Sequence, residues 1–315
     1  MPLGPLLALL GAVIAISSHG TALSLQDGVA APFKLFWHMS TVAMILVLMA
    51  IRTVLHSGIP RLNVGQWTTV LLAITCFVIQ NLCFVTALSY TTIGNTVIFA
   101  NSQAVLLLAA KVLTGSHVLW MEGWGALVAS GSAIVCAMSD HHDDTNKDNN
   151  TEALLGTLFA LASALAGVGY LTFAKSAQST ISVTLLTFLM MFGGSFLVLF
   201  FMILLGEEIS WSRHPYHGLF GWINMRPDRL GVEIWVVLVC NLVGTMGFVQ
   251  SMQYFDSIII AVATLLEPML ASLIAYGMGV GRFPGTGGWI GNLLVALGTL
   301  AGVYPSINKG EDNGQ

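Results

Sequence analysis

The residues best placed for chemistry are polar side chains inside otherwise apolar segments. Glu267 is the only acid deep in such a segment, and Thr264, three residues earlier, shares its helical face. Pro268 removes a backbone hydrogen bond and thereby frees the carbonyl of Thr264. An ionisable group inside a bilayer costs at least about 2.5–3.5 kcal/mol on insertion scales. We therefore expect Glu267 to bind a solute or a proton. The alternative is a protonated Glu267 that hydrogen-bonds a neighbouring helix beside a kink at Pro268.

Further polar side chains form stripes at helical spacing. Asn95, Ser102 and Gln103 stand at i, i+7 and i+8, and Asn241 and Thr245 stand at i and i+4. Small and amide residues also join membrane helices, so each one singly fits a packing role. As a set around one cavity they favour a path for a polar solute. The candidate substrate-binding or proton-coupling residues are Glu267, Thr264, Asn95, Ser102, Gln103, Gln80, Asn81, Tyr170, Asn241 and Thr245.

Histidine, lysine and cysteine give no metal or cofactor signature. His19 and His38 each stand alone in an apolar segment, where a hydrogen-bonded packing role is the expectation, and Lys34 can extend its charge to the membrane surface. The acidic stretch 139–152 contains two histidines, but a loop this polar is typically solvated. The four cysteines lie in apolar segments without metal-ligand spacing or a disulfide framework. We predict neither a bound metal nor a cofactor.

Composition defines the class of protein. Of 315 residues, 56% are hydrophobic and 8% are charged, and the mean hydropathy is +0.82. A soluble domain carries about 25% charged residues, so this chain is predicted to be an integral, multi-pass membrane protein. The net charge of −4 argues against a nucleic-acid partner, which needs a basic face. No Lys or Arg precedes the first apolar run, so that run is interpreted as a membrane helix rather than a signal peptide.

Ten segments are long and apolar enough to cross a membrane as helices. They span 3–23, 33–51, 66–90, 93–113, 119–138, 153–175, 181–205, 232–254, 258–280 and 287–305. The turns at 91–92 and 255–257 are so short that they force antiparallel neighbours. The counts of Lys and Arg on the two sides are nearly equal, so the positive-inside rule does not fix the orientation.

The ten segments divide into two sets of five. We predict an all-α fold of two five-helix repeats, 1–138 and 153–305, joined by a polar linker at 139–152 and followed by a polar tail at 306–315. An odd number of helices per repeat inverts the second repeat in the membrane. A shift of 164 positions aligns 67–115 with 231–279 without a gap, so that Gln103 meets Glu267. In inverted repeats the solute site lies near the midplane between the halves. We expect the first, third, fourth, sixth, eighth and ninth segments to line it.

Short motifs at the ends of both repeats resemble those of a known family. The second repeat carries Tyr254, Leu265-Leu266-Glu267-Pro268, Trp289-Ile290-Gly291 and Gly298, and the first carries Ala87-Leu88-Ser89-Tyr90, Trp124-Gly125 and Gly131. This pattern is similar to the drug/metabolite transporter superfamily, and specifically to its EamA-type branch. The chain departs from that pattern at Gln103-Ala104, at Ser116 and Arg282, where a Glu commonly stands, and in the longer loop 206–231. The resemblance implies ten helices, cytoplasmic termini and export or exchange of small metabolites.

We therefore expect a secondary transporter of a small organic metabolite that works by alternating access between the repeats. No Walker A motif is present, so the chain is not expected to use ATP. No Lys or Arg lies mid-helix, which disfavours highly phosphorylated solutes and leaves amino acids, other polar metabolites and organic cations. The alternatives are a membrane scaffold or receptor and, less favoured, an intramembrane enzyme. The chain has no G-x-S-G serine, paired membrane aspartates or H-E-x-x-H motif, so we predict no enzymatic activity.

Overall fold

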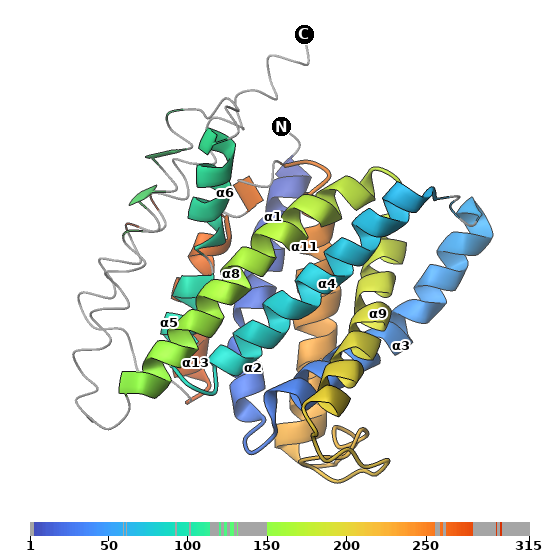
Figure 1. Cartoon of the computed structure of the whole chain (residues 1–315), viewed down its shortest axis with the longest axis vertical. Coiled ribbons are helices and arrows are strands. Elements are labelled where there is room, and N and C mark those ends of the chain that lie inside the picture. Colours follow the sequence, from blue (N-terminus) through green and yellow to red (C-terminus); the bar gives the residue numbers. More distant parts are fainter. Residues whose placement is uncertain are drawn as a thin grey trace.

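The computed structural model describes residues 3–58, 60, 62–91, 93–100, 102–113, 150–255, 259–260 and 263–279, with a few isolated positions in 120–131 and at 294 and 297. This part of the chain is all-helical (Figure 1). Its elements are α1 (Leu3–Ser17), α2 (His19–Leu25), α3 (Ala31–Ser57), α4 (Val64–Ala87), α5 (Ile93–Ala100), α6 (Gln103–Leu113), α8 (Asn150–Gln178), α9 (Val183–Leu204), η1 (Pro227–Gly231), α10 (Val232–Trp235), η2 (Val236–Thr245), α11 (Met246–Ser251), η3 (Thr264–Leu266) and α13 (Glu267–Gly277).

Six stretches of helix are long and apolar enough to cross a membrane, and they make the chain a multi-pass membrane protein. They are Gly4–Leu25, Ala31–Ser57, Val64–Ala87, Leu154–Gln178, Val183–Leu204 and Asp228–Ser251. At about 1.5 Å per residue each one exceeds the hydrocarbon thickness of a bilayer, about 30 Å. They correspond to the predicted first, second, third, sixth, seventh and eighth segments. The predicted segments 93–113 and 258–280 contain the shorter helices α5, α6, η3 and α13.

Other predicted ranges fall largely outside the described residues. These are the segments 119–138 and 287–305, the linker 139–152 and the tail 306–315. α8 begins at Asn150, three residues before the predicted start of the second repeat.

Local sequence sets the ends of the two helices that follow α2. Pro32 stands in the first turn of α3, where its missing N–H is not needed, and Gly58 ends that helix at φ 75°. Asn63 caps α4 by a reciprocal pair of hydrogen bonds with Gln66. The Gln66 N–H donates to Asn63 Oδ1 at 2.8 Å, and the Asn63 N–H donates to Gln66 Oε1 at 2.9 Å. The end of α3 and the start of α4 are therefore both marked by local sequence.

The long helices pack in pairs that join distant parts of the sequence. α4 lies along α8, α3 lies along α9, and α1 lies along η2 and α11 (Figure 1). Glycine allows two of these contacts to be close. A Cβ at Gly169 of α8 would lie 2.7 Å from the Cys76 sulfur on α4, and a Cβ at Gly244 of η2 would lie 2.8 Å from Ile16 of α1. Small residues at such crossings are typical of helix packing in membranes, where no hydrophobic effect draws helices together.

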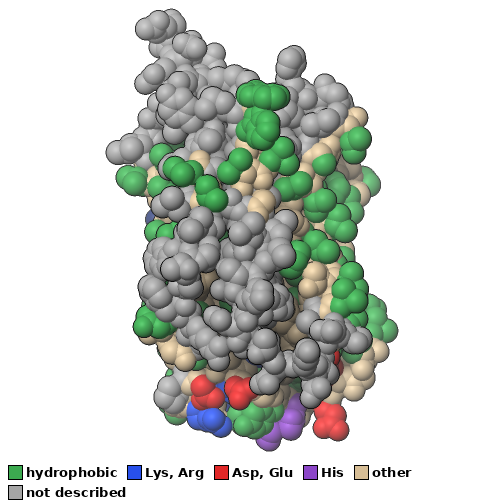
Figure 2. Space-filling model, turned by 90° about the vertical axis from the view of Figure 1, so that its left-hand side faces the viewer, with side chains coloured by type: hydrophobic (Ala, Val, Ile, Leu, Met, Phe, Trp, Pro, Cys, Tyr) green, Lys and Arg blue, Asp and Glu red, His purple; other side chains and the backbone are tan. Residues whose placement is uncertain are grey.

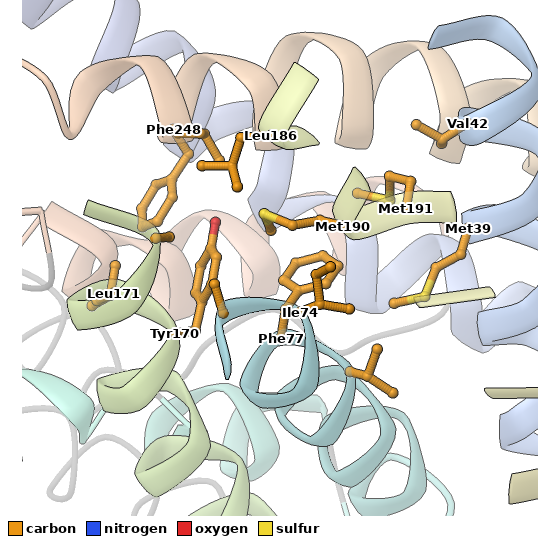
Figure 3. Close-up of a cluster of buried hydrophobic side chains, with 14 of the residues drawn as sticks. Met39, Val42, Ile74, Phe77, Tyr170, Leu171, Leu186, Met190, Met191 and Phe248 are labelled. Atoms are coloured by element: carbon orange, nitrogen blue, oxygen red, sulfur yellow. The ribbon is translucent and has the colours of Figure 1, made fainter. Parts of the chain in front are cut away.

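The buried core and the outer surface are both apolar, as a bilayer requires. Large side chains from many of the helices meet in one cluster; Met190 and Met191 of α9 and Phe77 of α4 lie near its centre (Figure 3). On the face shown in Figure 2, hydrophobic side chains cover most of the described surface, and charged side chains gather at one end. Leu48, at 73% exposure, is one of many exposed aliphatic side chains on the outer face.

The charged end of the bundle is covered by the segment 206–226, which the sequence predicted only as a soluble loop. It folds over the helix ends at the bottom of Figure 1 and is held by Arg229, which is fully buried. Arg229 Nε donates to Pro215 O at 3.0 Å and Nη2 donates to Asp27 O at 2.9 Å, so one guanidinium joins three parts of the chain. Trp37 Nε1 also donates to Gly218 O at 3.0 Å. This end is therefore a folded cap.

Candidate functional site

A cavity of about 110 Å³ lies between the helices, and its polar walls come from six segments of the chain. The segments are the first, third, fourth, sixth, eighth and ninth of those predicted from the sequence. Eight of the ten candidate residues line this cavity: Gln80, Asn81, Gln103, Tyr170, Asn241, Thr245, Thr264 and Glu267. Their role in solute or proton binding remains a prediction, but the structure brings them to one place.

The other two candidates stand apart from this lining. The Ser102 hydroxyl donates to Phe99 O at 2.7 Å and is not among the residues that line the cavity. Asn95 belongs to α5, and its side chain is outside the described residues.

Two interrupted helices meet at the cavity. α5 ends at Ala100 and α6 begins at Gln103, and the short 3-10 turn η3 leads into α13 at Glu267. Gln103 and Glu267 are the residues that the shift of 164 positions aligns, and each begins the second half of an interrupted helix. Gln103 Nε2 lies 3.5 Å from Thr264 Oγ1, so the two breaks are in contact. Such breaks expose backbone groups that a continuous helix would use internally.

The wall formed by α8 and α4 depends on a glycine. A Cβ at Gly167 would collide with Gln103 Oε1 and would lie 3.2 Å from Gln80 Nε2, so only glycine leaves room for both amides. One turn before Gly167, Ser163 donates its hydroxyl proton to Gln80 O at 2.9 Å, and this hydrogen bond joins α8 to α4. Tyr170 packs its ring against Phe77 at a centroid distance of 5.2 Å (Figure 3).

The opposite wall is a π-helix. Along η2 the widened turn brings Asn241 Nδ2 to 2.8 Å from Val236 O, five residues earlier, and Thr245 Oγ1 to 3.3 Å from Cys240 O. Thr245 Oγ1 also lies 3.4 Å from Asn241 Oδ1. π-turns inside α-helices are frequent at functional sites because they shift side chains out of the regular register. Here the shift turns two polar side chains toward the cavity.

Several polar atoms of the cavity are buried and keep hydrogen-bonding capacity for a solute or water. Gln80 Oε1, Gln103 Oε1 and the Tyr170 hydroxyl have no hydrogen-bond partner among the described residues. A buried polar group without a partner costs about 1–3 kcal/mol, so native proteins rarely leave three of them in one place. With the carboxyl of Glu267 they form a polar lining within an apolar bundle. No Lys or Arg side chain lines the described cavity.

Sequence reasoning did not place Cys240, Glu233 or His19 among the candidate residues. Cys240 lines the cavity, and the chain gave no signal for it beyond its alignment with Cys76. Glu233, which does not line the cavity, is 1% exposed near the start of the span Asp228–Ser251, so a second acid is buried in a membrane segment. His19 also lines the cavity, whereas a hydrogen-bonded packing role was expected for it and for His38. His19 Nε2 and His38 Nδ1 are buried without a partner in the described structure.

Comparison with known proteins supports the fold but gives no information about function. No protein-family model matches the chain, and no curated protein matches it significantly. Among solved structures 29 chains match, so the arrangement of helices is a recurrent one. One, described only as a crystal structure of a protein, aligns with 98% of this chain and 99% of its own length at a TM-score of 0.72. Its sequence identity is 15%, so the likeness concerns the fold alone.

Proposed function

We propose that the chain is a secondary transporter of a small organic metabolite and that the central cavity is its solute site. The observation that carries this proposal is the gathering of eight polar side chains from distant segments around one cavity in an otherwise apolar bundle. Polar groups inside a membrane are costly, so a set of them with unused hydrogen-bonding capacity favours a polar solute path. The cavity volume of about 110 Å³ suits a small solute.

We further propose ten membrane helices arranged as two inverted five-helix repeats, of the kind found in EamA-type members of the drug/metabolite transporter superfamily. The pairing of the long helices supports this arrangement. In the proposed repeats α1 corresponds to α8, α3 to α9, and α4 to η2 with α11. The contact of α1 with η2 and α11 then has its counterpart in the contact of α8 with α4. The contact of α3 with α9 joins two corresponding helices and is its own counterpart. A two-fold axis in the membrane plane gives this pattern.

Alternating access between two such repeats requires no ATP and no catalytic group. Rocking of one repeat against the other would open the cavity to each side in turn. The absence of cationic side chains from the described lining favours a solute without several phosphate groups. We therefore propose neither an enzyme activity nor a cofactor.

A counterflow experiment tests the proposal. The full-length protein is reconstituted in lipid vesicles that contain an unlabelled metabolite extract, and a trace of radiolabelled extract is added outside. A transporter exchanges the two pools, so label accumulates inside above the level of protein-free vesicles. A scaffold or receptor moves nothing, and equal label in both vesicle types would favour that alternative. Fractionation of the internal label by chromatography then identifies the solute.

A further inference from the structure

Titratable side chains continue from the wall of the cavity toward the capped end of the bundle. His19 of α2 lines the cavity, and its ring meets that of His38 of α3 edge to face, at 5.2 Å between centroids and an interplanar angle of 89°. Phe84 of α4 stacks on His19 at 6.5 Å. α10 contacts α2, and Glu233 of α10 accepts a hydrogen bond at its Oε2 from Gln26 Nε2 at 3.2 Å. Neither histidine nor Glu233 has a role in the solute path proposed above, although His19 lines its cavity.

Both imidazoles have an atom that can accept or share a proton. His19 Nε2 and His38 Nδ1 are buried and have no hydrogen-bond partner in the described structure, and His38 is 1% exposed. A histidine that served only for packing in a membrane would be expected to satisfy its ring nitrogens, because an unsatisfied polar group there costs free energy. Histidine is also the side chain whose charge, in water, changes between about pH 5 and pH 8, so its protonation responds to its surroundings. Two adjacent imidazoles with unused nitrogens therefore fit a proton site better than a packing pair.

The surroundings of the pair can respond to a positive charge. Glu233 is almost fully buried, and its Oε1 has no hydrogen-bond partner in the described structure. The other titratable side chains on the elements packed around the pair are Asp27, Lys34, Asp228 and Arg229 at the capped end, and Cys240 and Glu267 at the cavity. Lys34 and Arg229 are held by backbone carbonyls of Leu23 and Asp27. Acidic side chains thus lie at the cavity that His19 lines and at the capped end of the bundle.

We propose that His19 and His38 form a one-proton site in the wall of the cavity and that Glu233 stabilises the charged pair. This inference rests on the proposed transport function and adds its coupling ion. A hydronium ion in the cavity gives its proton to His19 Nε2 and leaves water, and the reverse transfer returns the proton when the cavity opens to the other side. Only one proton binds, because two imidazolium rings about 5 Å apart and shielded from water repel each other.

Coupling follows from the shared cavity. The charge on His19 adjoins the same small space as the solute and the carboxyl of Glu267. Solute and proton therefore influence each other's binding, and thermodynamic linkage makes that influence reciprocal. A transporter in which both species bind one cavity in each half-cycle can use a proton gradient to move its solute.

The proton site is tested without any solute. A full-length variant that retains only His19 and His38 among the eight histidines is isotope-labelled at histidine, reconstituted in lipid bilayers and titrated by solid-state NMR. We expect one imidazole signal of the two to convert to imidazolium between about pH 8 and pH 5. Glu233→Gln should shift that conversion to lower pH, because it removes a negative partner.

Two imidazoles that stay neutral at pH 5, or that both protonate independently of each other and of Glu233, would overturn the proposal. Should the variant fail to fold, the same titration applies to the wild-type protein, with signals assigned by His38→Asn.

The coupling is tested with the radiolabelled metabolite extract. Accumulation in vesicles is measured with and without an imposed pH gradient, and the ratio of the two is compared among variants. One coupled proton supports up to about tenfold accumulation per pH unit. His19→Gln and His38→Gln should reduce the ratio to about one, whereas His56→Gln, at an exposed position of α3, should keep the wild-type ratio. A wild-type ratio in both pair variants refutes coupling through these histidines. If wild-type protein moves no label at all, the transport function fails, and the NMR titration still decides whether the pair binds a proton.

Discussion

Replacement of Gly167 by alanine would place a methyl group in the wall of the cavity. The new Cβ would collide with the amide oxygen of Gln103 and would lie 3.2 Å from Gln80 Nε2. Both amides belong to flexible side chains, so they would move rather than the backbone. A methyl group occupies about the volume of one water molecule, roughly 30 Å³. That is about a quarter of the cavity volume of 110 Å³.

The expected effects on folding and on binding differ in size. Overpacking at a buried position destabilises by about 1–3 kcal/mol, and the higher helix propensity of alanine offsets about 1 kcal/mol of that. Gly11→Ala is the matched control, because a Cβ at Gly11 meets nothing within 4 Å. That substitution therefore gains only the higher helix propensity of alanine. Displacement of the two amides should remove one hydrogen bond to the solute or more, about 1.4 kcal/mol, which weakens the apparent affinity about tenfold.

The assay combines thermal unfolding with counterflow at increasing concentrations of extract. Gly167→Ala should show a half-saturation about tenfold above wild type, and it should be about 1–3 kcal/mol less stable than Gly11→Ala. Gly11→Ala should transport as wild type does. If Gly167→Ala folds and half-saturates at the wild-type concentration, the amides of Gln80 and Gln103 do not face the solute, and the cavity is not the binding site.

Three further predictions concern the cap, the acid and the topology. Arg229→Ala should lower the free energy of unfolding by about 3 kcal/mol or more, because buried hydrogen bonds to two distant carbonyls are lost; Arg226→Ala, at the surface, should leave the unfolding curve unchanged. Glu267→Gln keeps the shape of the side chain and removes its titration, so counterflow should lose rate or pH dependence, and a wild-type profile from about pH 5 to pH 8 would make Glu267 structural. Single cysteines at Pro2 and Gln315 should react with an impermeant reagent from the same side of the membrane, since ten crossings return the chain to its starting side; labelling from opposite sides contradicts that topology.

Hydropathy predicted the six membrane-spanning helices of the described structure, and it predicted their ends less well. Apolar runs identify a span because charged side chains are excluded from lipid, but a helix continues past the run when its end residues suit helix. α3 therefore reaches Ser57, although the predicted segment stops at 51. The break between α1 and α2 was not predicted, because neither glycine nor proline marks it. Ser17 and Ser18 instead bond the carbonyls of Val13 and Ala15, which competes with regular helix.

Polar residues of the cavity were visible in the sequence because they are exceptions in apolar runs. Gln80 and Asn241 fall near the middle of such runs, so distance from the ends already indicated burial. Glu233 was overlooked because it lies near the start of its segment, where an acid is usually solvated. Its partner Gln26 is distant in the sequence, and the cap at this end is held by long-range contacts of Arg229 that no local pattern indicates. The contact of His19 with His38 is likewise a product of tertiary packing.

The most direct test of a solute path through the central cavity is the initial rate of counterflow in wild type and in Gln103→Leu. Leucine keeps the bulk of the side chain and removes the amide that reaches Thr264 and the cavity. Wild-type vesicles should take up label saturably, and Gln103→Leu should reduce the rate about tenfold, as expected for a lost hydrogen bond to the solute. Thr68→Val, at an exposed position of α4, is the control and should match wild type. Wild-type uptake no greater than in protein-free vesicles, or an equal rate in Gln103→Leu, would contradict a transport path through this cavity.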